Sequence, residues 1–166
     1  MEKNEEQKLR EIINTYQTEL LHFCYIRLQD KMMAEDAVQE TFLKVYRHLS
    51  GYKDEGHEKA WLYRIALNVC RDMLRSGWFR RINRHITPEL LPDDRTPPNE
   101  EEIALSQAIH HLPVKSREVI LLHYYQGFSV TETASILGIR QSSASERLQR
   151  AREQLKAMLK GEFEDE

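Results

Sequence analysis

Apolar residues recur every three or four positions through two long blocks of this chain, about residues 5 to 76 and about 101 to 160. This spacing places them on one side of an α-helix, whereas a half-buried strand needs strict alternation of apolar and polar residues. No segment rich in Val, Ile and Thr has such an alternation. The sequence therefore predicts an all-α fold.

A proline-rich segment separates the two helical blocks. The stretch ITPELLPDDRTPPN, residues 86–99, holds four of the five prolines. Proline disrupts a helix interior because it lacks the amide hydrogen and clashes with the preceding turn. We therefore expect two small helical domains, residues 1–85 and 101–166, joined by an acidic linker over residues 86–100.

The distribution of charge is more informative than the net charge of −3. Residues 59–84 carry a net charge of +6 and residues 140–160 a net charge of +4, while DDRTPPNEEE and the tail EFEDE are acidic. Two basic zones in an acidic chain predict two separate contacts with a polyanion.

Other features narrow the class of protein. No apolar run approaches the roughly 18 residues of a membrane span, and the start MEKNEEQKLREII lacks the regions of a signal peptide, so we expect a cytoplasmic protein without membrane insertion. Cys24 and Cys70 lie in apolar helical patterns and are expected to be reduced core residues. Phosphate loops, nucleophile elbows and zinc spacings do not occur in the sequence, which predicts no enzyme, metal or cofactor.

The second block contains the start and stop signals of several short helices. Pro113 suits the first turn of a helix that Gly127 ends. Ser129 and Glu132 match a capping box, in which each side chain bonds the other residue's backbone amide at a helix start. These signals predict a helix and then a second, short helix after the glycine.

A third helix follows Gly138, four residues after the small residue Ala134, and Ser142 or Ser143 could cap it. This arrangement is typical of a helix-turn-helix, whose last helix enters the major groove by its start. The residues expected near base edges or phosphates are Arg140, Gln141, Ser142, Ser143, Ser145, Glu146 and Arg147, with Arg150 and Arg152 further back for backbone contact. The alternative is an ordinary helical hairpin with a solvated basic face.

The segment KAWLYRIALNVCRDMLR, residues 59–75, has two contrasting helical faces. Its predicted core side consists of Leu62, Ile65, Ala66, Val69 and Met73. Its other side consists of Trp61, Arg64, Asn68, Arg71 and Arg75, with Lys59 at its start. A basic face with an aromatic residue, beside the glycine-flanked loop 51–58, is typical of a surface that holds a nucleic-acid backbone and unstacked bases. The alternative is that Trp61 packs in the core and the arginines are solvated.

The segment AEDAVQETFLKVYRHL, residues 34–49, also divides into two sides. The inward stripe is predicted to be Ala34, Ala37, Val38, Thr41, Phe42, Val45 and Leu49. The outward side is predicted to be Asp36, Gln39, Glu40, Leu43, Tyr46 and Arg47. Exposed Leu43 and Tyr46 beside charged residues indicate a protein-binding patch, although isolated exposed leucines are also common.

These segments together resemble bacterial RNA polymerase sigma factors of the extracytoplasmic-function type. AEDAVQETFLKVYRHL resembles their core-polymerase-binding segment, and KAWLYRIALNVCRDMLR resembles their minus-ten promoter helix. LPVKSREVILLHYYQGFSVTETASILGI, followed by RLQRAREQL, is similar to their minus-thirty-five-binding helix-turn-helix. The resemblance covers roughly residues 8 to 160, with the segments in the family's order.

The resemblance implies a promoter-specific polymerase subunit without catalytic residues. It implies contact of Asp36, Gln39, Glu40, Leu43 and Arg47 with the β′ clamp, and contact of the second domain with the β flap. It also implies that the loop 51–58 holds a flipped minus-ten base, that Asn68 and Arg71 contact the opened strand, and that the linker runs toward the RNA exit path. An anti-sigma factor is a further expected partner.

The start of the last helix departs from the family pattern. It reads RQSSASERL, with Ala144 and Ser145 where members often carry Val and Lys, and Glu146 adds a negative charge. We therefore expect a different minus-thirty-five preference.

Two other readings stay open at this point. In a stand-alone helix-turn-helix regulator the first block would sense a ligand or dimerise, but such a protein does not need the EDAVQETFLKVYR face. An α-helical adaptor without a role on DNA would not explain the two basic zones.

Overall fold

The computed structural model describes residues 2–53, 56–76 and 100–164. All secondary structure in these ranges is helical, which confirms the predicted fold class. The chain divides into two compact units, Met1–Thr87 and Pro88–Glu166. Of the expected linker, residues 86–99 lie outside the described ranges, and Glu100 begins a helix.

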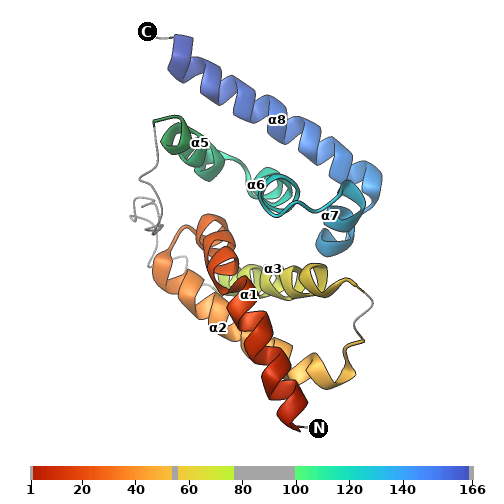
Figure 1. Cartoon of the computed structure of the whole chain (residues 1–166). Helices are drawn as coiled ribbons and strands as arrows, with labels where there is room; N and C mark the ends of the chain where they lie inside the picture. The colour runs from red at the N-terminus through yellow and green to blue at the C-terminus, as the bar shows by residue number, and fades with distance from the viewer. Residues whose placement is uncertain (1, 54–55, 77–99, 165–166) are drawn as a thin grey trace. The chain divides into compact units, whose positions relative to one another are not determined.

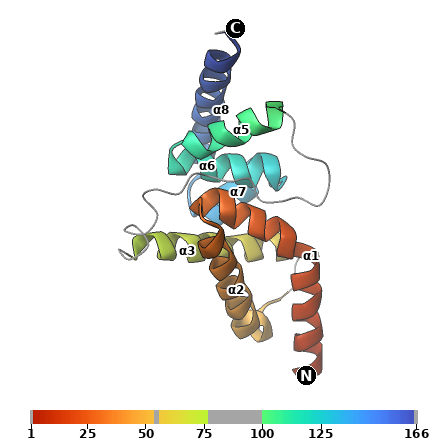
Figure 2. The ribbon, with the colours of Figure 1, turned by 90° about the vertical axis from the view of Figure 1, so that its left-hand side faces the viewer.

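Over residues 2–53 and 56–76 the first unit consists of three α-helices, each of which packs against the other two. Its elements are α1 (Glu2–Leu28), α2 (Lys31–His48), the 3₁₀ turn η1 (Leu49–Gly51) and α3 (Glu58–Arg75), which are drawn in Figures 1 and 2. Gln29 makes the turn between α1 and α2 with a positive φ of 61°. Asp30 then caps α2, because its Oδ1 atom accepts a hydrogen bond of 2.8 Å from the Met33 amide.

Small side chains let the three helices approach closely. Ala34, Ala37 and Ala66 are completely buried. The rings of Phe23 in α1 and Tyr63 in α3 meet edge to face with 5.1 Å between centroids, a favourable aromatic geometry. The core of this unit is therefore built from all three helices.

Cys24 and Cys70 are buried free thiols, as their apolar patterns predict. Their Sγ atoms lie 3.7 Å apart across the contact between α1 and α3. The neighbouring Cys70 and burial raise the pKa of Cys24, which therefore stays a protonated thiol.

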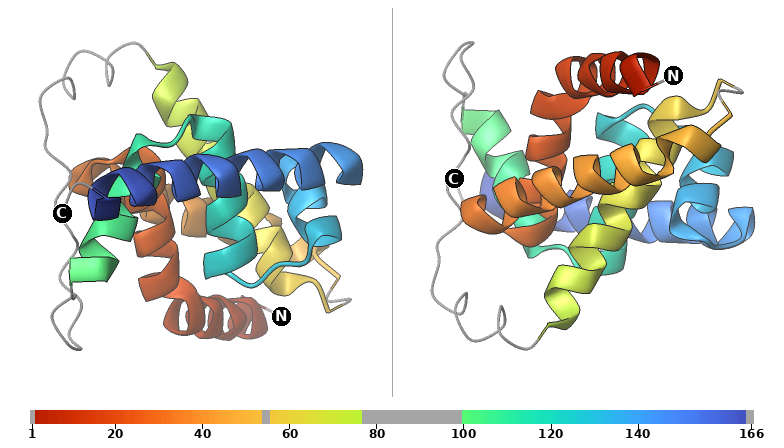
Figure 3. Two further views of the ribbon diagram at one scale, coloured as in Figure 1. Left: turned by 90° about the horizontal axis from the view of Figure 1, so that it is seen from above. Right: turned by 90° about the horizontal axis from the view of Figure 1, so that it is seen from below.

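Helix α1 changes direction along its length, which is clearest in Figure 3. The Thr15 hydroxyl donates a 2.7 Å hydrogen bond to the Glu11 carbonyl one turn earlier. Such back-bonding often accompanies a bend in a helix, because the hydroxyl competes for a carbonyl of the backbone ladder.

The second unit contains α5 (Glu100–His111), α6 (Val114–Ile120), the π-helical turn η2 (Leu121–Tyr125), α7 (Val130–Leu137) and α8 (Gln141–Glu164). Helix α8 packs against α5, α6 and α7. The helix predicted between Pro113 and Gly127 is therefore present, but its second half is π-helical.

A buried arginine joins α6 to the end of α5. The Arg117 guanidinium donates to the backbone carbonyls of Ile109, His110 and Leu112, at 3.2, 2.8 and 2.9 Å. Carbonyls at a helix end lack partners within the helix, so this side chain satisfies groups that burial would otherwise leave unbonded.

Helix α7 begins and ends with the features predicted for a helix-turn-helix. The Ser129 hydroxyl accepts from the Glu132 amide and the Glu132 carboxylate accepts from the Ser129 amide, both at 3.0 Å, which confirms the capping box. Gly138 has a φ of 70°, a left-handed conformation that glycine adopts without steric cost. It lies in the turn between α7 and α8, as predicted.

The predicted serine cap of the last helix is wrong. Helix α8 begins at Gln141, and the Arg140 carbonyl already accepts a 3.0 Å hydrogen bond from the Ala144 amide. Ser142 and Ser143 therefore lie inside the first turn. The turn after Gly138 is tighter than the sequence suggested.

Replacing Ser129 by alanine removes one half of the capping box and should lower the free energy of unfolding by about 1 kcal/mol. Chemical denaturation of the full chain, followed by circular dichroism, measures this change. Hydrogen exchange at the first-turn amides of α7 should also become faster.

Ser135→Ala is the matched control, because Ser135 is exposed on the same helix outside its first turn. Alanine favours helix interiors, so this variant should be neutral or slightly more stable. Equal destabilisation by both variants would contradict the capping role of Ser129.

Candidate nucleic-acid and protein interfaces

The core side of α3 is partly rotated relative to the prediction. Leu62, Ala66 and Val69 are buried as expected. The structure also buries Tyr63, Leu67 and Cys70, while Ile65 and Met73 are only half-buried. Helix α3 contacts α1 as well as α2, so a broader side is covered than one apolar stripe indicates.

The opposite side of α3 leaves most of its polar and basic residues exposed to solvent. Arg64, Asn68 and Arg75 are exposed, and Arg71 is half-buried. Arg75 forms an ion pair of 3.7 Å with Asp72, but both side chains stay more than half exposed. A phosphate can therefore reach this arginine face, which we define as Arg64, Asn68, Arg71 and Arg75.

Trp61 lies at the edge of the arginine face. Its ring stacks on Tyr52, with 4.1 Å between centroids and 17° between the ring planes. The Trp61 side chain is half-buried, so it belongs neither to the core nor fully to solvent. The stack fastens the chain after η1 to the first turns of α3. Residues 54 and 55 of the expected base-holding loop lie outside the described ranges.

Lys59 points toward α1 and not along the arginine face. Its Nζ atom is 3.9 Å from Oε2 of Glu19 and 5.9 Å from the centroid of the Tyr63 ring. The sequence pattern alone placed Lys59 at the start of the basic track. Glu19 lies forty residues before Lys59, so a local sequence pattern could not predict this pairing.

The outer side of α2 carries the residues predicted for it. Asp36, Gln39, Leu43, Tyr46 and Arg47 are exposed, and Glu40 is half-buried. Leu43 and Tyr46 keep 51% and 47% of their surface accessible, which is high for large apolar side chains. All seven residues of the predicted inward stripe are buried.

Met32 extends this surface toward the start of α2. It is 76% exposed and lies eleven residues before Leu43, which is about three helical turns and so the same side of the helix. We define the α2 stripe as Met32, Asp36, Gln39, Glu40, Leu43, Tyr46 and Arg47. Met32 lies two residues before the segment 34–49 and so was not among the residues predicted for this surface.

The start of α8 presents a polar, basic surface. Its exposed residues are Arg140, Gln141, Ser142, Ser145, Glu146 and Arg150, while Ser143 and Arg147 are half-buried. Ala144 is completely buried. It therefore packs the helix-turn-helix and does not face outward.

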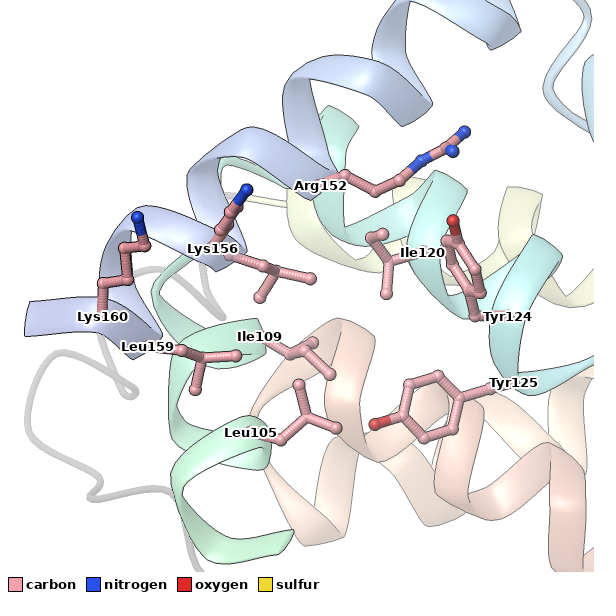
Figure 4. Close-up of a pocket in the computed structure, with 10 residues that line it drawn as sticks. Leu105, Ile109, Ile120, Tyr124, Tyr125, Arg152, Lys156, Leu159 and Lys160 are labelled. Carbon is pink, nitrogen blue, oxygen red and sulfur yellow. The ribbon is translucent and has the colours of Figure 1, made fainter. Parts of the chain in front are cut away.

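A groove of about 890 Å³ lies between α5, α6, η2 and α8 of the second unit. Figure 4 shows its apolar side chains, which come from all of these elements. The apolar and aromatic lining residues are Leu105, Ile109, Ile120, Tyr124, Tyr125, Leu155 and Leu159.

One edge of this groove is cationic. Arg152, Lys156 and Lys160 recur at every fourth position of α8 and so follow one side of the helix. The Arg152 guanidinium carbon is 5.8 Å from the centroid of the Tyr124 ring, a cation–π geometry. Arg152 thus lines the groove. The sequence pattern predicts a DNA-backbone contact for the same residue.

Two classes of site are not found among residues 2–53, 56–76 and 100–164. No helix there is both long and apolar enough to cross a membrane. No group of three or more His, Cys, Asp or Glu side chains there could hold a metal ion.

The geometry defines a class of protein: two helical units, one with a basic aromatic helix face and the other with a helix-turn-helix. Comparison with known protein families agrees. Residues 12–80 match the model of sigma-70 region 2, and residues 102–155 match that of sigma-70 region 4.

Individual relatives carry the same description. The chain is 33% identical over 144 residues to RNA polymerase sigma factor SigZ of Bacillus subtilis, which covers 81% of this chain and 77% of SigZ. It is also 33% identical over 130 residues to ECF RNA polymerase sigma factor SigM of Mycobacterium tuberculosis, which covers 76% of this chain and 64% of SigM. The chain thus spans less than two thirds of the length of that SigM.

Among solved structures, CnrH in complex with the cytosolic domain of CnrY superposes with a TM-score of 0.70 at 25% identity. The match covers 94% of this chain and 90% of the other. The chain belongs to the extracytoplasmic-function type of the sigma-70 family. Both sigma regions match, so the stand-alone regulator is not favoured.

Proposed function

We propose that this chain binds core RNA polymerase in the cytoplasm and directs promoter-specific initiation of transcription. It supplies recognition and strand opening, while the polymerase supplies the catalytic residues. Membership of the sigma-70 family and the two basic surfaces support this function.

The observation that carries the proposal is the exposed α2 stripe. It combines two large apolar side chains, Leu43 and Tyr46, with the charged residues Asp36 and Arg47. Aromatic residues, Met and Arg are enriched in protein interfaces, so this composition fits a polymerase contact. We assign the stripe to the β′ clamp.

The arginine face of α3 is assigned to the minus-ten element. Arg64, Arg71 and Arg75 supply phosphate ligands, and Asn68 supplies an amide for a base edge. Trp61, stacked on Tyr52, offers an aromatic surface beside the same strand. The loop 51–58 would hold the flipped base.

The start of α8 is assigned to the minus-thirty-five element. Arg140 and Gln141 have the side chains that read guanine and adenine in the major groove, and Arg150 suits a phosphate. Glu146 accepts hydrogen bonds and so favours a cytosine amino group. The start of α8 is also the reason that we expect a minus-thirty-five sequence preference different from that of most family members.

The groove of the second unit is assigned to a partner helix. A helix with an apolar face fits a groove of apolar side chains, and acidic residues along one edge would face Arg152, Lys156 and Lys160. CnrH, a similar protein of known structure, was solved in complex with the cytosolic domain of CnrY. We propose that an anti-sigma factor supplies such a helix here. The β flap remains the proposed polymerase contact of the same unit.

The proposed function as a whole is tested by transcription in vitro. Purified chain and core polymerase are incubated with a library of promoters, and the templates that yield RNA are sequenced. Enrichment of two spaced sequence elements is expected. Absence of transcripts above core enzyme alone would contradict the proposal.

Leu43→Ala combined with Arg47→Ala should weaken binding to core polymerase by about 30-fold or more, because truncation of interface hot spots costs about 2 kcal/mol or more. Co-purification with core enzyme and a binding titration measure this loss. His48→Ala is the control, since His48 is exposed on α2 but lies off the stripe. Undiminished binding of the double variant would refute the assignment.

Arg71→Ala should reduce strand opening at all target promoters roughly tenfold, which corresponds to about 1.4 kcal/mol. Arg147→Ala should reduce transcription only where a minus-thirty-five element is present. Permanganate reactivity and transcript yield on templates with and without that element separate the two effects.

Arg10→Ala, which removes an exposed arginine of α1, serves as the control for charge. Normal opening by Arg71→Ala, or an Arg147→Ala defect that persists without the element, would be evidence against these DNA contacts.

The groove should prefer acidic over basic amphipathic helices. An amphipathic peptide of about 18 residues is long enough to form a helix on binding. A peptide with glutamates along one edge should bind the full chain about tenfold tighter than its lysine counterpart, as two ion pairs of roughly 0.7 kcal/mol would give.

Fluorescence anisotropy of the labelled peptides measures both affinities. In the variant Lys156→Glu with Lys160→Glu the preference should reverse. Equal affinities for both peptides in the unaltered chain would exclude an acidic partner helix.

A further inference from the structure

The first turn of α3 carries two adjacent residues of opposite charge, and each faces an opposite charge on α1. Lys8 Nζ lies 2.8 Å from Oε1 of Glu58. On the next residue, Lys59 Nζ lies 3.9 Å from Oε2 of Glu19. Two independent ion pairs thus connect the start of α3 to one helix.

Tyr16 adds a third connection. Its hydroxyl donates to Oε2 of Glu58 at 3.4 Å. Burial and the adjacent Glu58 charge raise the pKa of Tyr16, so the phenol stays protonated and keeps donating at neutral pH. The Glu58 carboxylate therefore forms an ion pair with Lys8 and accepts a hydrogen bond from Tyr16, both on α1.

The two ion pairs connect neighbouring residues of α3 to well-separated points on α1. Lys8 and Glu19 are about three helical turns apart on α1, whereas Glu58 and Lys59 are neighbours. The buried side of α3 already holds the helix in place. Two attachments about three turns apart on α1 further oppose a rotation of its first turn. Because the charges alternate, an exchanged pairing would bring like charges together.

The residues that follow this turn are those proposed to meet the opened strand. Trp61 lies one turn after Glu58, and its amide bonds the His57 carbonyl at 2.9 Å. Arg64 begins the arginine face in the next turn. A small rotation at the start of α3 would move both side chains.

We propose that Glu58 and Lys59 are positioning residues, which Lys8, Tyr16 and Glu19 hold in place so that Trp61 and Arg64 are oriented for the opened promoter strand. This inference rests on the proposed function in strand opening. Lys59 then acts through Glu19 and is not itself a phosphate ligand.

A role in orientation fits the exposure of these groups better than a role in stability. The side chains of Lys59 and Glu19 are 33% and 56% exposed, and those of Lys8 and Glu58 are 37% and 22% exposed. Ion pairs in such positions contribute little to the free energy of unfolding and weaken as salt screens them. Their effect should appear in strand opening, and it should diminish at high salt.

Glu19→Lys separates the two roles of Lys59. It breaks the pair with Lys59 by repulsion, but it leaves Lys59 in place and adds a positive charge. If Lys59 were a phosphate ligand, opening would stay equal or improve. If Lys59 is a positioning residue, opening should fall about two- to fivefold, the range that an exposed ion pair supports.

The control is Glu11→Lys, which makes the same charge change at an exposed glutamate of α1. Permanganate reactivity of minus-ten thymines is measured in reconstituted holoenzyme, on a promoter recovered from the library. Core binding and circular dichroism are measured alongside and should not change in either variant.

The double variant Glu19→Lys with Lys59→Glu restores the pair in reversed orientation and should recover most of the opening. Equal opening by Glu19→Lys, Glu11→Lys and the unaltered chain would overturn the inference. So would a double variant that is no better than Lys59→Glu alone. If the unaltered chain does not open promoters with core enzyme, the proposed function fails instead.

Discussion

The packing of α3 against α1 and α2 decides which side chains the first unit leaves in solvent. Leu62, Leu67 and Cys70 are completely buried, so α3 can expose only its opposite side. The arginines on that side stay out of the core because removing an unpaired guanidinium from water costs more free energy than its apolar contacts would provide. A basic surface therefore follows from the way one helix is buried.

The same logic applies to α2 with a different result. Its buried alanines bring α2 close to its neighbours, and its outer side is left with Met32, Leu43 and Tyr46. Apolar residues that lie together on an exposed helix side commonly mark a site where another protein binds. The first unit thus presents two surfaces of different chemistry, one suited to a polyanion and the other to protein.

In the second unit, capping and side-chain hydrogen bonds to the backbone add to the apolar core. Arg117 satisfies the carbonyls at the end of α5, and the capping box at Ser129 starts α7. The His123 ring donates from Nδ1 to the Phe128 carbonyl at 2.7 Å and so holds the chain between η2 and α7. Helix α8 packs against these elements through the buried Ala144, Leu148 and Ala151. Its start faces outward and its later turns line the groove.

Local patterns predicted the all-α fold, the capping box, the turn at Gly138 and both sides of α2, because each depends on residues within a few positions of one another. The start of α8 was misplaced, since two serines offered caps that a tighter turn does not use. Contacts between distant segments could not be predicted in this way. The pairing of Lys59 with Glu19, the approach of Cys24 to Cys70, the rotation of α3 and the groove all arise where helices remote in sequence meet. A helical repeat states which residues share a side, but only the neighbouring helices determine how much of that side is covered.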